Sequence, residues 1–146
     1  MNNRVVGVLL FAVALLTNLG WTAETWAQAK LPRVGILTSF PLTDDPSLRQ
    51  WFEPFRRTLA DQGWIEGKNV LFEYRSAQND SSRYAETAAE LVTLKVDVIW
   101  ATSAPMVRAA YAATRTIPIV AQDFTTDPVA EGYVESYSRP SGNVTG

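Results

Sequence analysis

The sequence predicts an α/β protein built on one doubly wound parallel sheet. Short apolar segments that fit buried strands alternate with segments of helical periodicity, in the order β-α-β-α-β-α-β-α, followed by the start of a fifth strand. Each crossover is long enough for a right-handed βαβ unit. The expected strand order is 2-1-3-4-5, which puts the first strand at the centre and the switch point of the sheet between the first and third strands.

The first 29 residues are set apart from this fold. They contain Arg4, an apolar run from Val5 to Leu16 and the small-residue exit Ala27-Gln28-Ala29, which together are typical of a secretory signal peptide. The apolar run is shorter than the roughly 20 residues that cross a bilayer, so a membrane anchor is the weaker interpretation. We expect residues 1–29 to be a signal peptide cleaved after about Ala29, and residues 30–146 to be one exported, periplasmic α/β domain.

The composition excludes several classes of function. The chain has no cysteine and no histidine, which rules out disulfides, a lipid anchor on cysteine, Ser–His–Asp or Cys–His catalysis and the common zinc sites. Its basic residues are scattered and its net charge is −2, so no nucleic-acid surface is expected. A G-x-S-x-G elbow, a P-loop and a G-x-G-x-x-G turn are all missing from the sequence. We therefore expect no enzyme, no cofactor and no metal. Carboxylate or Ser–Lys chemistry on the same fold is the weaker alternative.

The first predicted strand begins at Arg33 and runs into the exit loop Thr38–Pro41. The helix after it has apolar residues at helical spacing, namely Leu48, Trp51, Phe52, Phe55 and Leu59. Ser47 and Gln50 resemble a capping box, and Gly63 is the expected left-handed terminator. Pro54 leaves two alternatives: an irregular first turn, or a regular helix that begins nearer Glu53.

The next elements are a strand at Val70–Arg75 and a helix that starts at Asn79–Ser82. The apolar face of this helix carries Tyr84, Ala88, Leu91 and Val92. Glu86 and Glu90 lie one turn apart on this helix and are expected to form a solvated face rather than a functional carboxylate pair. The third strand is Val96–Ala101.

A helix through Thr114 follows the third strand, with Pro105 in its first turn, where the missing N–H costs nothing. The fourth strand is Ile117–Ala121, and Pro118 predicts that its pairing begins one or two residues later. Asp127-Pro128 predicts a helix from Val129 to about Tyr137, and Asn143–Gly146 is the start of a fifth strand.

Several blocks of sequence, in the same order, resemble one family. They are Arg33–Leu37, Gly63–Val70 with Glu73-Tyr74-Arg75, Leu91-Val92 to Val96–Ile99, Thr116–Val120, Asp127–Val129 and Arg139–Gly146. The chain is similar to the substrate-binding proteins of an ABC-transporter family whose characterised members include binders of tryptophan and tyrosine. Ser141 departs from the glycine that is usual in the family.

The resemblance implies a two-lobed, clamshell binding protein of the periplasmic type I kind, of which this sequence is the N-terminal lobe. It also implies a small-molecule solute as ligand, the transporter's permease and ATPase as partners, and membrane contact only through the permease. In the family the Asn-Val-Thr-Gly block leads into a second lobe, so we expect a truncated form with weak binding. A ligand-sensing domain of a receptor is an alternative function for the same lobe.

The expected solute site lies at the carboxyl ends of strands one, three and four. Its candidate residues are Thr38, Ser39, Phe40, Thr102, Ser103, Ala104, Asp123, Phe124 and Thr125. Hydroxyls and the free amides of the helix that follows Ser103 fit a carboxylate, Asp123 fits an ammonium group, and the two phenylalanines fit a flat or apolar part of a solute. The alternatives are a simple helix cap for Ser103, packing for each phenylalanine, and a turn cap for Asp123.

Overall fold

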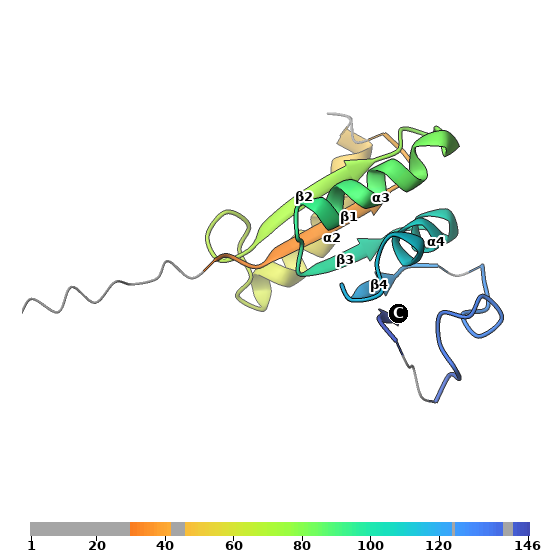
Figure 1. Ribbon diagram of the computed structural model, residues 1–146. Coiled ribbons are helices and arrows are strands. Elements are labelled where there is room, and N and C mark those ends of the chain that lie inside the picture. Colours follow the sequence, from red (N-terminus) through yellow and green to blue (C-terminus); the bar gives the residue numbers. More distant parts are fainter. Residues whose placement is uncertain (1–29, 42–45, 124, 139–141) are drawn as a thin grey trace, which may run out of the picture. The chain divides into compact units, whose positions relative to one another are not determined.

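A five-stranded parallel sheet of order β2-β1-β3-β4-β5 organises the computed structural model (Figure 1). The structure describes residues 30–41, 46–123, 125–138 and 142–146, and Leu31–Gly146 form one compact unit. The strands are β1 (Arg33–Thr38), β2 (Leu71–Ser76), β3 (Val98–Ala101), β4 (Ile119–Ala121) and β5 (Val144–Thr145). The predicted fold class and strand order are confirmed.

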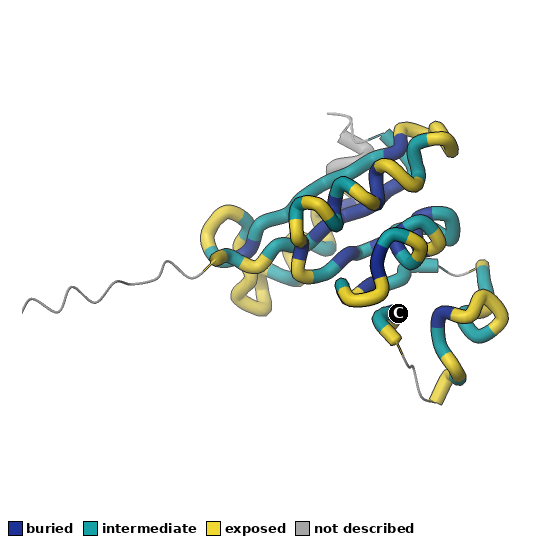
Figure 2. Tube along the Cα trace, viewed as in Figure 1, coloured by how far each residue is buried: buried dark blue, intermediate teal, exposed yellow. Residues whose placement is uncertain are grey.

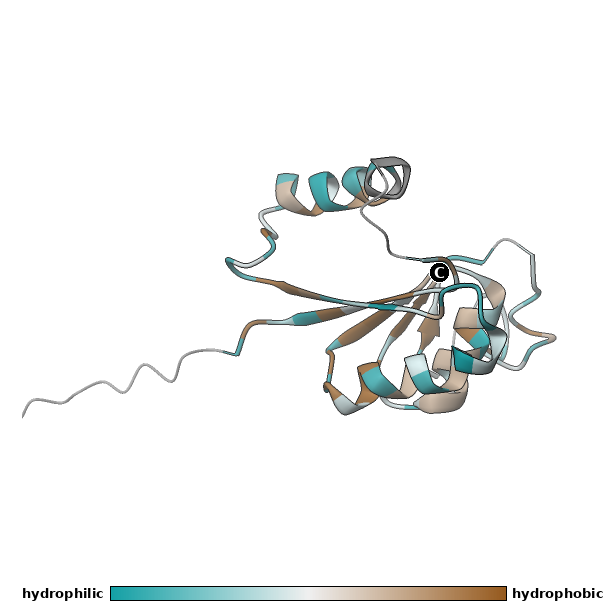
Figure 3. Cartoon of the chain, turned by 90° about the horizontal axis from the view of Figure 1, so that it is seen from above, coloured by the Kyte–Doolittle hydropathy of each residue, from teal (hydrophilic) through white to brown (hydrophobic). Residues whose placement is uncertain are grey.

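The helices divide between the two faces of the sheet. They are α2 (Pro46–Asp61), α3 (Tyr84–Thr93), preceded by the 3-10 turn η1 (Ser81–Arg83), and α4 (Ala104–Ala113). Seen from above in Figure 3, α2 lies alone on one side of the sheet and the other helices lie on the opposite side. This division follows from right-handed crossovers, because β1-α2-β2 winds in one direction along the sheet and the later crossovers wind in the other.

The α3 and α4 face holds the main core. Leu37, Leu91, Ile99, Met106 and Ile119 are fully buried there, and Figure 2 shows burial concentrated on the central strands and on the sheet-facing sides of these helices. Gly35 lets α3 approach β1 closely: a Cβ atom at this position would lie 3.0 Å from Leu91 Cδ1 and 3.2 Å from Val96 Cγ2. The absence of a side chain at Gly35 therefore sets the distance between the helix layer and the central strand.

The α2 face is built from aromatic rings. Phe52 makes edge contacts with Tyr74 and Trp100, with ring centroids 5.8 and 6.0 Å apart, and Phe55 stacks on Trp100 at 4.3 Å. Burial in this layer, together with the negative charge of Glu66, raises the pKa of Tyr74 to about 12.

The helix α2 begins at Pro46 and continues through Pro54, which removes the alternative of a helix that starts near Glu53. Gly63, with φ +88°, ends the helical segment as predicted. The amide of Gly63 donates to Ala60 O at 2.9 Å and that of Trp64 to Leu59 O at 2.8 Å, the two bonds of a Schellman motif.

The described residues cover only part of the sheet face on which α2 lies. An apolar groove of about 470 Å³ runs there, and its lining includes Val34, Phe55, Trp100 and Val120. Val120 is 39% exposed, although it lies in a central position of an all-parallel sheet. All-parallel sheets are normally covered on both faces, and the described residues leave this part of the face open.

The predicted helix from Val129 to Tyr137 is wrong. Asp127 caps a first turn by accepting hydrogen bonds from the amides of Val129 and Ala130, with Pro128 at the first helical position, as its sequence indicated. Gly132, with φ +72°, then closes the segment after that single turn. Its amide donates to Val129 O and the Tyr133 amide donates to Pro128 O, again the Schellman pattern. Capping at both ends within six residues leaves no room for a longer helix.

Other predicted boundaries are shifted by small amounts. Val96 is buried but precedes β3, which begins at Val98, and β2 runs from Leu71 rather than Val70. β4 begins at Ile119, immediately after Pro118, as predicted. Within the described part of the chain, no helix has the length and apolar character needed to span a membrane.

Replacing Gly35 with alanine is expected to lower the free energy of unfolding by about 1–3 kcal/mol, because the new methyl group overpacks the contact with Leu91 and Val96. Urea denaturation measures the effect. In the double variant Gly35→Ala/Leu91→Ala, removal of the Leu91 methyls, which are the nearest atoms at 3.0 and 3.1 Å, makes room, so the total loss should be smaller than the sum of the two single losses. Strict additivity would show that Gly35 does not set the packing distance.

Candidate functional site

The exit loops of β1, β3 and β4 lie side by side at the carboxyl edge of the sheet. The amide of Thr102 donates to Leu37 O at 3.1 Å, and the amide of Gln122 donates to Ala101 O at 2.8 Å. These bonds extend the strand pairing into the loops. The structure thus brings the three predicted segments to one edge of the sheet, as the parallel topology requires.

The β1 exit is held by internal hydrogen bonds. Thr38 is fully buried and its hydroxyl donates to the Phe40 carbonyl at 2.9 Å, while Ser76 Oγ donates to the same carbonyl at 2.6 Å. Ser39 O accepts a bond from the Asn79 amide at 2.6 Å. The Phe40 ring lies 6.4 Å from that of Phe52, an aromatic contact within the domain. Thr38 and Phe40 therefore shape the loop from within.

The β3 exit carries an unusual serine. Ser103 has extended backbone angles at the start of α4, yet its side chain makes no capping hydrogen bond. Its Oγ is buried and has no hydrogen-bond partner within the described ranges. The neighbouring Thr102 hydroxyl instead donates to Leu37 O at 3.2 Å. Buried polar groups are almost always paired, so the Ser103 hydroxyl is a group that a ligand or water can complete.

The first turn of α4 adds positive electrostatic potential to this edge. Ala104 is the first helical residue and Pro105 follows it. The amides of an opening helical turn have no partner inside the helix, and the helix dipole places partial positive charge there. The structure therefore places the start of a helix directly after β3.

The β4 exit presents an anchored carboxylate. Asp123 Oδ1 accepts hydrogen bonds from the amide and the hydroxyl of Thr125, both at 2.8 Å, and Oδ2 accepts one from the Thr126 hydroxyl. Burial raises the pKa of Asp123, but these hydrogen bonds outweigh it and leave the pKa below its ordinary value. Asp123 is thus both a turn cap and an anion at neutral pH. Phe124 lies outside the described residues.

Sequence reasoning missed Gln122. Its side-chain oxygen is buried without a hydrogen-bond partner in the described part of the protein, and the residue lines the apolar groove beside Trp100 and Val120. The only signal for it was its place as a polar residue directly after β4. Strand alternation puts Gln122 on the α2 face rather than with the turn that holds Asp123.

The surface hollows do not all coincide with this edge. A hollow of about 160 Å³ includes Asp123 and Thr126 and extends under the turn that carries Tyr133. A larger one, of about 710 Å³, lies between α2 and the Trp64–Glu66 turn, far from the exit loops in the chain topology. Charged side chains such as Arg56 line it, and we assign it no role in solute binding. Over the described ranges, no group of three or more histidine, cysteine, aspartate or glutamate side chains is placed to hold a metal ion.

Comparison with known proteins identifies the family. The family model described as ABC transporter substrate binding protein matches residues 37–146. The chain belongs to this family. The tyrosine-binding protein of Clostridioides difficile strain R20291 is 40% identical over 105 residues, which are 72% of this chain and 30% of that protein. The predicted resemblance is confirmed.

Solved structures of substrate-binding proteins have the same fold. One is the ligand-free, open structure of a substrate binding protein with adhesive properties from Clostridium difficile, with a TM-score of 0.68 and 32% identity. Another is an ABC domain in complex with L-Trp from Streptococcus pneumoniae, with a TM-score of 0.67 and 25% identity. Each match covers 80% of this chain and 38% of the solved chain. The chain therefore spans well under half the length of these solved chains.

The lowered pKa of Asp123 leads to a test of its anchoring. Thr126→Val keeps the shape of the side chain but removes a hydrogen-bond donor, so the Asp123 pKa should rise toward its ordinary value in a carbon-detected NMR titration. Thr93→Val on α3, which removes a hydroxyl bonded to Ala89 O, is the matched control and should leave Asp123 unchanged.

The same shift fixes the pH dependence of stability. The pKa of Asp123 is lower in the folded state than in the unfolded state. Its contribution to the free energy of unfolding is therefore fully present above the ordinary aspartate pKa, and it is lost as the pH falls through the lowered pKa. The stability advantage of the wild type over Asp123→Asn should shrink in that acid range. A constant difference down to the lowest pH would contradict the assignment.

Proposed function

We propose that this chain forms the N-terminal lobe of an extracytoplasmic solute-binding component of an ABC transporter, and that it binds a small solute such as an amino acid against a second lobe. The observation that carries the proposal is the pairing of opposite charges at the exits of neighbouring strands. The open first turn of α4 follows β3, with a Ser103 hydroxyl that has no hydrogen-bond partner in the described segments, and the anionic turn of Asp123 follows β4.

A zwitterionic amino acid fits this arrangement. Its carboxylate would accept hydrogen bonds from the Ser103 hydroxyl and from the amides of Ala104 and Met106, where the helix dipole favours negative charge. Its ammonium group would pair with Asp123, which stays ionised because its pKa is lowered. Thr125 would act through Asp123, since its amide and hydroxyl both donate to that carboxylate.

The remaining predicted features complete the proposal. Residues 1–29 would direct export to the periplasm and be removed, and residues 30–146 would be one wall of a two-lobed site. The permease and ATPase of the transporter would be the partners, and the permease would recognise the closed form. In support, the matched region is 30% of the tyrosine-binding relative, and one structural neighbour was solved with L-Trp. A single wall would bind its solute weakly.

An NMR titration with three indole compounds tests the proposal. L-Tryptophan should shift the amide signals of Ala104, Met106 and Thr125 with a millimolar dissociation constant, since only one wall contacts it. Tryptamine lacks the carboxylate and indole-3-propionate lacks the ammonium group, so both should bind more weakly than L-tryptophan.

Two controls separate the charged contacts. Asp123→Asn removes the partner of the ammonium group, so it should abolish the preference for L-tryptophan over indole-3-propionate. Ser103→Ala removes a partner of the carboxylate, so it should reduce the preference for L-tryptophan over tryptamine. If neither L-tryptophan nor a panel of other amino acids shifts these three amides, the proposed site is wrong.

A further inference from the structure

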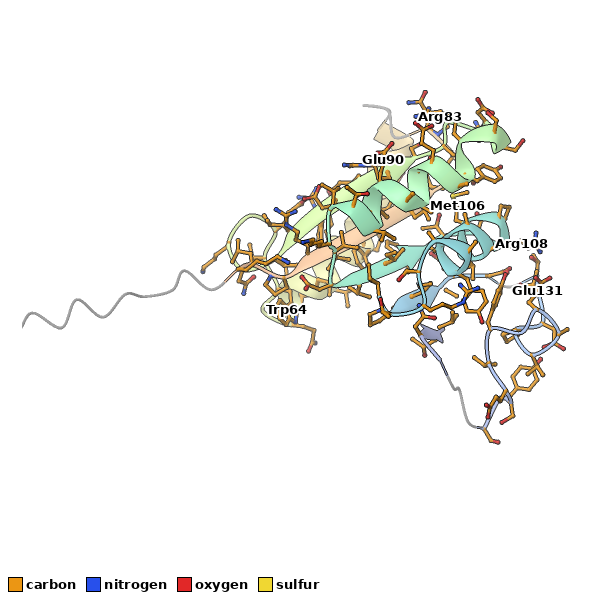
Figure 4. The ribbon with its side chains drawn as sticks, viewed as in Figure 1. Trp64, Arg83, Glu90, Met106, Arg108 and Glu131 are labelled. Carbon is orange, nitrogen blue, oxygen red and sulfur yellow. The ribbon has the colours of Figure 1, made fainter. Side chains whose placement is uncertain are left out.

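A set of contacts fixes the closed turn Asp127–Val134 to the outer side of α4. Arg108 Nη2 lies 3.1 Å from Glu131 Oε1, and Figure 4 shows the two side chains close together. One helical turn further along, the Tyr111 hydroxyl donates to Gly132 O at 3.0 Å. We call the contacts of Arg108 and Tyr111 with Glu131, Gly132 and Tyr133 the α4 clamp.

Aromatic packing gives the clamp a rigid centre. Tyr133 is 5% exposed, and its ring meets that of Tyr111 edge-on with centroids 4.9 Å apart. The guanidinium of Arg115 lies 3.6 Å from the centroid of the Tyr111 ring. Tyr111 is thus held by contacts with a ring and a cation while its hydroxyl engages the backbone of the turn. Such a side chain has little freedom to move without moving Gly132.

The turn that the clamp holds is a closed unit. Asp127 caps its first amides and accepts a hydrogen bond from Tyr137 Oη at 2.7 Å, and the Schellman bonds close it at Gly132. Movement at Gly132 is therefore transmitted to Asp127. Asp127 directly follows Thr126, which donates to the Asp123 carboxylate, so the closed turn and the anionic turn are adjacent in the chain.

The ion pair of the clamp contributes more to geometry than to stability. The Arg108–Glu131 pair is solvent-exposed on the arginine side, at 59%, and surface pairs of this kind add little to the free energy of folding. Yet the pair and the Tyr111 hydroxyl bond tie the loop after β4 to the helix whose first turn follows β3. These are the two segments that carry opposite charges in the proposed site.

We propose that Tyr111 is a positioning residue for solute binding: through Gly132 and the closed turn it holds the Asp123 carboxylate at a fixed place relative to the first turn of α4. Tyr111 touches no solute itself. The inference rests on the proposed function, since the distance between the two charged groups matters only for a ligand that bridges them.

The test compares Tyr111→Phe with Tyr84→Phe, a matched substitution on α3. Tyr111→Phe keeps the ring and its packing but loses the bond to Gly132 O. It should weaken L-tryptophan binding about threefold to tenfold, the effect of one hydrogen bond. It should also raise the Asp123 titration midpoint, because a less restrained turn holds its threonine donors less well. Arg108→Gln should act in the same direction, and Tyr84→Phe should change neither quantity.

The outcomes separate this inference from the proposed function. Unchanged affinity and an unchanged Asp123 midpoint in a folded Tyr111→Phe protein would overturn the positioning role and leave the clamp as a packing contact. If the wild type binds no amino acid while Tyr111→Phe still moves the midpoint, the proposed function fails and the link from Tyr111 to Asp123 stands. Equal losses in Tyr84→Phe would also overturn the inference, because they would indicate a general loss of stability.

Discussion

The right-handed crossover is the constraint on which this structure depends. Because β2 lies on one side of β1 and β3, β4 and β5 on the other, the first crossover places α2 on one face and the next two place α3 and α4 on the opposite face. The change of direction also opens the carboxyl edge between β1 and β3. The polar exit loops lie together at that edge because of the winding of the sheet. Gly35 allows α3 to pack close to β1 within this arrangement.

The hydrogen bonds that the predicted site residues make divide these residues into two groups. The hydroxyls of Thr38, Thr102 and Thr125 are used inside the domain, where they fix the loops. Ser103 and Asp123 differ from them. The first has a buried hydroxyl without a partner among described residues, and the second keeps its charge because donors surround it. Residue type alone gave no means to separate these groups, since each hydroxyl looks equally available until its neighbours are known.

The fold was predictable from the sequence because its signals are periodic and local. Buried strands, the apolar stripe of α2 and the terminator Gly63 are all visible in the chain. The prediction of a helix after Asp127 failed because it rested on the start signal Asp127-Pro128 alone, whereas Gly132 closes the turn a few residues later. The α4 clamp depends on contacts between segments distant in sequence, such as Tyr111 with Gly132, and so does the surrounding of the Gln122 oxygen, which has no hydrogen-bond partner among the residues that the structure describes. No local pattern encodes such contacts.

Exposure of the carboxyl edge to water limits the affinity with which one lobe could bind a charged solute. At 4 Å two opposite charges gain about 1 kcal/mol in water and about 4 kcal/mol at the effective dielectric of a protein surface. The proposed bonds from a solute to Asp123 and to the first turn of α4 would therefore strengthen several-fold once water is excluded. A lobe alone leaves one side of each bond in water, whereas a second lobe closing over the solute would remove that water. In this proposed arrangement, the clamp and the threonine donors would set the geometry in advance, and lobe closure would supply most of the affinity.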